Sequence, residues 1–197
     1  MAIIAKAENG SGFTPIPEGV HTAICYAIID LGMHYSEKFG KTSHKALIMW
    51  ELPDEKIEID GEEKPRAISK EYTLSLSEKA NLRKDLQAWR GKAFTDEELS
   101  GFDMQNVLGK GCQLQVIHTE ANGKTYSNIV SIMGLPKGMK LDEPYNPITY
   151  FDLDEPDALT TIGNLPAWVQ DKIKASETYK NMSDFHPAPE EEDGLPF

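Results

Sequence analysis

A long period-two alternation begins at Gly19, and it constrains the fold of this sequence more than any other feature. Side chains suited to a pleated surface recur at every second position from Val20 to Ile28. Because successive side chains of a strand point to opposite faces, this spacing predicts a strand and not a helix. We expect the strand to continue to about Met33, which is long for a strand, so a β-sheet should organise the fold.

Four further segments with strand character follow, and turn signals separate them. We expect strands at about residues 43–52, 67–76, 112–120 and 124–133. Asp60-Gly61 and Asn122-Gly123 are strong signals for two-residue hairpin turns, because both positions of such a turn need positive φ. The acidic stretch 53–64 is therefore predicted to form a protruding hairpin. Residues 34–41, rich in aromatic and basic side chains, are expected to be a loop.

The spacing of apolar residues changes between the third and fourth strands. Leu82, Leu86 and Trp89 are spaced i, i+4, i+7, which places them on one face of a helix. We expect Ser77 to cap this helix and Gly91 to end it. Its basic residues are interpreted as a solvated surface: Lys79, Arg83, Lys84, Arg90 and Lys92.

Three strands, a helix and a two-strand hairpin are the element order of the five-stranded OB-fold barrel. The sequence therefore predicts a mainly β protein, namely such a barrel with a helix between strands three and four. Other small barrels and α+β sheets use the same order. A capping box at 95–98 adds a short helix, and Pro166 starts a C-terminal helix in which Trp168 is expected to pack inward.

The chain is predicted to divide into four parts. We expect a mobile N-terminal arm (1–17), an OB-fold domain (18–135), an extension that packs on the barrel (136–181) and a disordered acidic tail (182–197). Phe13 and Ile16 of the arm are candidates to dock on the body. Prolines at 144, 147 and 156 break the extension, whose stretch 150–154 is amphipathic and should lie along the barrel.

The net charge of −12 argues at first against a nucleic-acid partner. The charge is uneven, however, because residues 151–197 carry −8 and residues 1–150 only −4. Within residues 1–150, six acids crowd into 54–63. Outside that segment 16 bases face 15 acids, so a positive groove is compatible with the composition.

Several other classes of protein are disfavoured by what the sequence lacks. It has no apolar run of membrane-spanning length, and its start lacks a signal-peptide pattern, so we expect a cytoplasmic protein. Cys25 and Cys112 lie far apart without metal-site spacing and are interpreted as buried free thiols. The sequence shows no Ser elbow, P-loop, dinucleotide motif or paired-His metal motif. We therefore predict no catalytic residue, metal or cofactor.

The last eight residues are Glu190, Glu191, Glu192, Asp193, Gly194, Leu195, Pro196 and Phe197. Four consecutive carboxylates repel one another, and the prolines resist helix, so this stretch is not expected to bury itself. Its apolar end, which carries the α-carboxylate on Phe197, suits a partner pocket with a basic rim. A tail that only aids solubility is the alternative.

This terminus resembles the acidic tip of bacterial and phage single-stranded DNA-binding proteins, in which acids precede a branched aliphatic residue, proline and phenylalanine. Gly194 stands where that family usually has another acid, and Leu195 replaces the commoner isoleucine. The body resembles phage-encoded replication proteins of the same type in segments across residues 13–180. These segments are 50–53, 72–76, 79–86, 89–91, 109–110, 126–129 and 150–153.

The resemblance implies sequence-independent binding of single-stranded DNA in phage replication or recombination. Such binding needs lysines or arginines for phosphates and flat side chains for stacking bases. OB folds bind ligands through the strand 1–2 and strand 4–5 loops and the face of strands two and three. The candidates are Tyr35, Lys38, Phe39, Lys41, Lys45, Trp50, Arg66, Lys70, Tyr72, Lys124 and Tyr126.

The tip residues are predicted to bind replication or recombination proteins. These residues are Glu190, Glu191, Glu192, Asp193, Leu195, Pro196 and Phe197. Two alternatives stay open. An OB-fold adaptor would bridge such proteins without binding DNA, and a strand-annealing protein would pair two complementary strands. Trp50 and Tyr72 also share their alternation with apolar neighbours, so both are candidates for the core as well.

Overall fold

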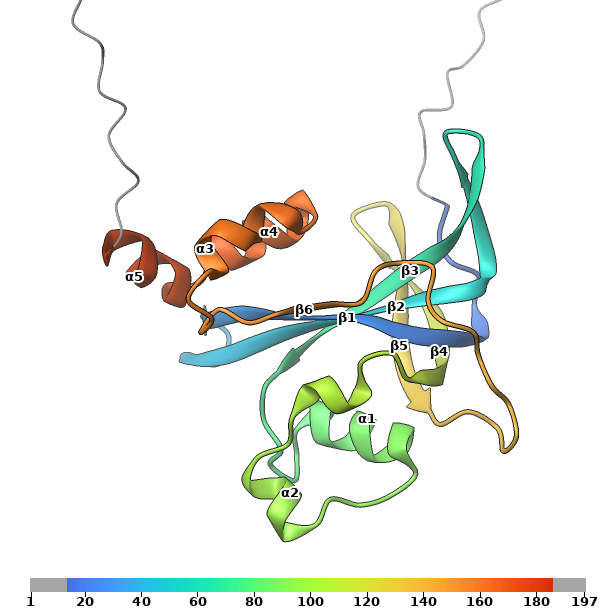
Figure 1. Cartoon of the computed structure of the whole chain (residues 1–197), viewed down its shortest axis with the longest axis horizontal. Helices are drawn as coiled ribbons and strands as arrows, with labels where there is room; N and C mark the ends of the chain where they lie inside the picture. The colour runs from blue at the N-terminus through green and yellow to red at the C-terminus, as the bar shows by residue number, and fades with distance from the viewer. Residues whose placement is uncertain (1–13, 186–197) are drawn as a thin grey trace, which may run out of the picture.

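The fold is built on one antiparallel sheet, which a computed structural model describes together with its helices over residues 14–185 (Figure 1). The strands are β1 (Gly19–Ser36), β2 (Lys41–Ile59), β3 (Glu62–Thr73), β4 (Gly111–Ala121), β5 (Lys124–Met133) and β6 (Thr149–Phe151). They hydrogen-bond in the order β3-β2-β1-β4-β5, and β6 adds to β1 in parallel. The predictions of a mainly β protein and of five principal strands are confirmed.

The first two strands are longer than predicted, and the predicted loop 34–41 shrinks to a tight turn. β1 and β2 stay paired until Ser36 meets Lys41. At the opposite end of β2, β2 and β3 form the predicted hairpin, which turns at Asp60 (φ 54°) and Gly61 (φ 81°). Asn122 (φ 52°) and Gly123 (φ 72°) make the equivalent turn between β4 and β5. Both Xaa-Gly turns are therefore confirmed.

The sheet is not closed into a barrel, which corrects the prediction of a closed OB barrel. β3 and β5 are the two ends of the hydrogen-bonded path, and they pair with β2 and β4 alone. Residues 14–17 lie where the two edges approach, and the Ile16 side chain, 2% exposed, fills the core there. This segment contacts side chains of both β3 and β5, which do not pair with each other.

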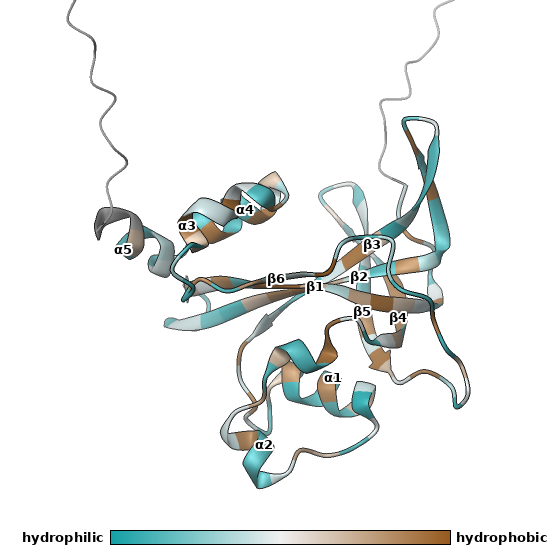
Figure 2. Cartoon of the chain, in the orientation of Figure 1, coloured by the Kyte–Doolittle hydropathy of each residue, from teal (hydrophilic) through white to brown (hydrophobic). Residues whose placement is uncertain are grey.

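Helices cover both faces of the sheet (Figure 1). One face holds α1 (Asn81–Arg90), α2 (Asp96–Ser100) and the 3-10 turn η1 (Met104–Val107). The other carries α3 (Ala158–Thr161), η2 (Ile162–Asn164), α4 (Ala167–Lys174) and α5 (Glu177–Phe185). Each side has its own apolar core, and Figure 2 shows hydrophobic residues gathered on the central strands between them.

The helix starts and faces differ in part from the predictions. α1 ends at Gly91 in the left-handed conformation as predicted, but its N-cap is Ala80 and not Ser77. Trp168 is 44% exposed, whereas Val169 and Ile173 on the same helix are fully buried. The buried face of α4 is therefore formed by Val169 and Ile173 and not by the predicted Trp168. The capping box at Thr95 is confirmed.

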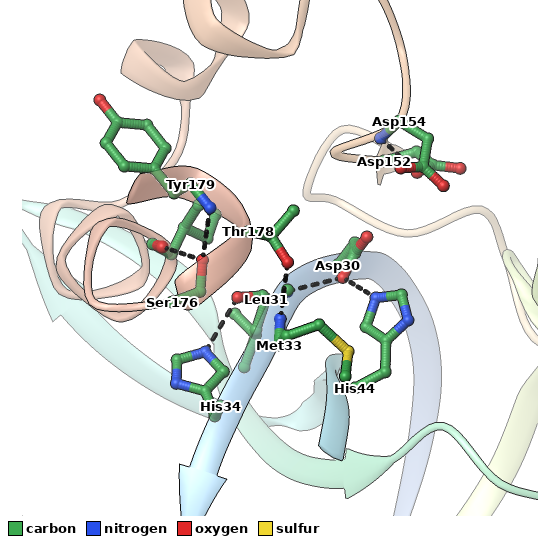
Figure 3. Close-up of polar contacts among 12 residues, drawn as sticks. Asp30, Leu31, Met33, His34, His44, Asp152, Asp154, Ser176, Thr178 and Tyr179 are labelled. Carbon is green, nitrogen blue, oxygen red and sulfur yellow. Dashed lines mark hydrogen bonds and ion pairs between the residues drawn. The ribbon is translucent and has the colours of Figure 1, made fainter. Parts of the chain in front are cut away.

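The C-terminal helix α5 docks on a bulge in β1 (Figure 3). The Asp30 carboxylate accepts the Gly32 N–H (2.7 Å) and lies 2.6 Å from His44 Nε2. Thr178 Oγ1 accepts the Met33 N–H at 2.9 Å. A Cβ at Gly32 (φ 79°) would lie 2.7 Å from Ser176 Oγ, so only glycine suits this close approach.

Helix α5 continues past residue 182, where disorder was predicted to begin, and ends at Phe185. The remainder of the predicted tail lies outside the described residues, as does Phe13. The stretch 150–154 lies along the sheet: it overlaps β6, and Phe151 and Leu153 are buried in the second core.

Candidate nucleic-acid interface

A groove of about 470 Å³ opens beside the β1–β2 turn. The turn and the start of β2 contribute Phe39, Lys41 and Lys45. The end of β3 contributes Lys70 to Thr73, and the segment leading into α1 contributes Lys79 among other residues. Four lysines and an exposed aromatic ring therefore line one cavity.

The tight turn is what exposes the ring of Phe39. The backbone N–H groups of Phe39 and Gly40 both bond to the Ser36 carbonyl, at 3.2 and 2.8 Å. Gly40 takes φ 59°, which favours glycine at this position. Phe39 therefore stands at the tip of the hairpin with 67% of its surface exposed. Lys38 Nζ lies 5.4 Å from the ring centroid, so a cation adjoins the only aromatic side chain of the turn itself.

The charge of the groove lining is positive because four lysines face one carboxylate, that of Glu71. Glu71 Oε2 lies 3.0 Å from Lys172 Nζ of α4, and Asp85 Oδ2 lies 2.7 Å from Lys70 Nζ. Lys45 Nζ donates to Thr73 Oγ1 at 2.9 Å, a neutral partner that leaves its charge uncompensated. Lys41 and Lys79 are exposed. Lys41, Lys45 and Lys79 are thus the cations that an anionic ligand would meet.

Two of the predicted stacking residues are core residues instead. Trp50 is 0% exposed, and its ring centroid lies 5.9 Å from that of Trp89. Tyr72 is also buried, and its hydroxyl donates to Asp85 Oδ2 at 2.7 Å. Burial, with the Asp85 charge beside it, raises the pKa of Tyr72 well above its ordinary value. Both predictions are corrected, because these side chains face α1 and the apolar core.

Arg66 was predicted to contact DNA, but it binds the chain itself. Its Nη1 donates to the Pro15 carbonyl at 3.1 Å, and its Nη2 donates to the Thr14 carbonyl. Arg66 lies on β3 opposite Leu52, whereas the groove begins four residues further along β3 at Lys70. This residue therefore belongs to the N-terminal seam and not to the groove.

Lys124 and Tyr126 lie at the far end of the sheet from the groove. β1 meets β2 at Ser36 near the groove, whereas its first residue, Gly19, pairs with Val116 of β4. The β4–β5 hairpin extends beyond that point. The structure therefore does not bring the two predicted loops together. Tyr35 is exposed and pairs with Thr42, so it lies at the groove end of β1 without lining the groove.

The prediction missed Lys79, which it treated as part of a solvated helix surface. Lys79 precedes the first residue of α1 and lines the groove together with Ser75, Ser77 and Asn81. The sequence carried no signal for this role, because Ser77 was predicted to cap the helix, whereas α1 begins at Asn81. Residues 75–80 form a polar linker from β3, and such a linker lies next to the strand that it leaves.

Comparison with known proteins adds no family: no protein-family model matches the sequence, and no curated protein matches it. Among residues 14–185, no helix is long and apolar enough to cross a membrane. Within the same residues, no group of three or more His, Cys, Asp or Glu side chains is arranged to hold a metal ion.

Proposed function

We propose that this protein binds single-stranded DNA without sequence preference, and that its site is the groove beside the β1–β2 turn. The observation that carries the proposal is the exposed Phe39 ring at the mouth of a groove with four lysines. Unpaired bases offer a π-face to such a ring, and phosphates offer charge to the lysines.

The binding step follows from the charges. Lys41, Lys45 and Lys79 neutralise phosphates and release the counterions that surround the strand. Phe39 stacks on a base at the tip of the turn, and Tyr35 extends the aromatic surface along β1. Lys70 stays on Asp85 and contributes mainly to the shape of the groove wall.

The strand order supports an OB-type fold for this proposal. The sheet has the strand order β3-β2-β1-β4-β5, with α1 between β3 and β4 in the sequence. A five-stranded OB barrel has the same order and is closed by pairing of its third and fifth strands, which are unpaired with each other here. In such folds the strand 1–2 loop and the strand 2–3 face are ligand-binding positions. The groove uses the first of these, together with the exposed edge of β3.

The C-terminal tip is proposed to recruit replication or recombination proteins. This part of the proposal depends on sequence alone, since Glu190 to Phe197 lie outside the described residues. The four carboxylates would compete with DNA for the same lysines, and bound DNA would release the tip for a partner. Removing residues 190–197 should therefore leave DNA affinity equal or higher while partner binding is lost.

Fluorescence anisotropy of an end-labelled oligo-dT tests the DNA-binding proposal. A labelled strand is preferable to intrinsic fluorescence, because Trp50 and Trp89 are buried away from the groove. We expect binding in the micromolar range or tighter at low salt, and log affinity should fall linearly with log salt. Absence of binding at micromolar protein in low salt would reject the proposal and favour an adaptor that bridges proteins without DNA.

A further inference from the structure

The open side of the sheet is filled by the chain's own residues Thr14–Pro17, which we call the strap. Four strands hold it through side chains, and His21 Nε2 of β1 lies 2.7 Å from the Pro17 carbonyl. Arg66 of β3 donates to the carbonyls of Thr14 and Pro15. The Ile16 carbonyl lies 2.8 Å from His118 Nε2 of β4 and accepts from Ser127 Oγ of β5 at 3.0 Å.

The apolar part of the strap completes the core between the sheet and α1. Ile16 is 2% exposed and belongs to the same apolar cluster as Ile68 of β3 and Ile129 of β5. Its neighbours Thr14 and Pro17 are exposed. The strap is thus anchored by one buried side chain and by carbonyl groups that point at donors on four strands.

The two prolines of the strap explain why it does not pair as a further strand of the sheet. Pro15 and Pro17 have no N–H group, so two of the four strap residues cannot donate to a ladder. The hydrogen bonds that side chains of the four strands make with the strap all run to its carbonyls. Breaking these bonds therefore does not break a strand pair.

We propose that the strap is a releasable closure: it seals the seam between β3 and β5, and it opens as a unit while the rest of the fold stays intact. The β1–β2, β2–β3 and β4–β5 ladders do not pass through the strap. The second core, beneath α3, α4 and α5, lies on the other face of the sheet and does not include Ile16. Release would therefore bare the edges of β3 and β5 and one side of the first core.

This inference does not depend on DNA binding, and its test uses the full chain without DNA. Hydrogen–deuterium exchange with mass spectrometry is measured for the unchanged protein, Arg66→Gln, Ser127→Ala and the control Lys64→Gln. Lys64 lies two residues from Arg66 on β3, and its Nζ pairs with Glu62 at the surface, 3.2 Å away. The control removes the same charge without a strap contact.

In Arg66→Gln we expect exchange about tenfold faster in peptides that cover the strap, β3 and β5, because hydrogen bonds from a charged group are lost. Ser127→Ala should shift the same peptides by a smaller factor. Peptides covering β2 residues 46–52 and helix α4 should keep their rates, and Lys64→Gln should match the unchanged protein.

Two results would overturn the inference. Uniformly faster exchange in all peptides of Arg66→Gln would show that the strap opens only when the whole domain unfolds. Unchanged exchange in the strap and both edges, in Arg66→Gln and in Ser127→Ala alike, would show that these carbonyl contacts do not hold the seam closed.

Discussion

The Tyr72 hydroxyl donates a hydrogen bond to Asp85 Oδ2 over 2.7 Å, and this contact ties β3 to α1 directly beneath the groove. Lys70 Nζ lies 2.7 Å from the same oxygen and 5.2 Å from the Tyr72 ring centroid. The Asp85 carboxylate thus binds both Tyr72 and Lys70, two residues that the sequence predicted to contact DNA. The ring is structural, and the groove wall depends on it.

Tyr72→Phe tests that assignment. Removing the hydroxyl takes away one bond to a charged acceptor, so we expect the free energy of unfolding in urea to fall by about 1.5–3 kcal/mol. The affinity for oligo-dT, measured below the unfolding transition, should change less than about twofold, since no stacking surface is lost. A large loss of affinity with unchanged stability would instead return Tyr72 to the binding site.

Phe39→Ala should produce the opposite pattern. One stacked base contributes about 1–3 kcal/mol, so affinity for oligo-dT should fall about 5- to 150-fold. Stability should hardly change, because the ring is mostly exposed. Tyr145→Ala is the matched control: its side chain is 60% exposed and belongs to a loop outside the groove. Equal losses in both variants would argue against a specific stacking position.

The salt dependence of binding reports how many lysines meet phosphates. Replacing Lys41 or Lys45 by Gln should lower the magnitude of the log–log salt slope by about 0.7 each, the value for one phosphate contact on a single strand. Lys137→Gln, an exposed lysine in the loop after β5, should leave the slope unchanged. The measurement is a series of oligo-dT titrations at increasing salt, and slopes that do not separate these variants would contradict the groove assignment.

Alkaline pH should destabilise the fold through its buried weak acids. Burial raises the pKa of the Cys25 thiol from 9.0 to about 12 and that of Tyr26 from 10.0 to about 12. The folded state favours the protonated forms, so this stability is complete below about pH 9 and is lost as pH rises toward 12. Each group should lower the free energy of unfolding by about 1.4 kcal/mol per pH unit within its window.

Urea unfolding at several pH values between 8 and 11 measures that slope. Cys25→Ala removes one of the titrating groups, so its stability should decline less steeply above pH 9 than that of the unchanged protein. An identical decline in both proteins would show that the Cys25 thiol does not contribute.

The strands, both Xaa-Gly turns and the position of α1 follow from the sequence because their signals are local. Alternation predicts a strand, but it does not say which of its two faces meets a helix. Trp50 and Tyr72 illustrate this: their parity is compatible with a ligand face or a core face, and only the packing of α1 decides. The same limit applies to Trp168 on α4.

The candidate site could be predicted only where it is formed by one hairpin. Phe39, Lys41 and Lys45 are close in sequence, and they share the groove as expected. Joining Lys124 and Tyr126 to them required a closed barrel with short strands, whereas β1 is 18 residues long and separates the two hairpins. The role of Arg66 depends on residues 14–16, some 50 positions away, for which the sequence gives no pairing signal.

Ultraviolet cross-linking of the full chain to oligo-dT, followed by mass spectrometry of the attached peptides, tests the central claim most directly. We predict that the nucleotide is attached within residues 35–45, at Phe39 or Tyr35, and that Phe39→Ala reduces this product. Attachment chiefly at Tyr126 on the β4–β5 hairpin, with residues 35–45 unmodified, would contradict the account.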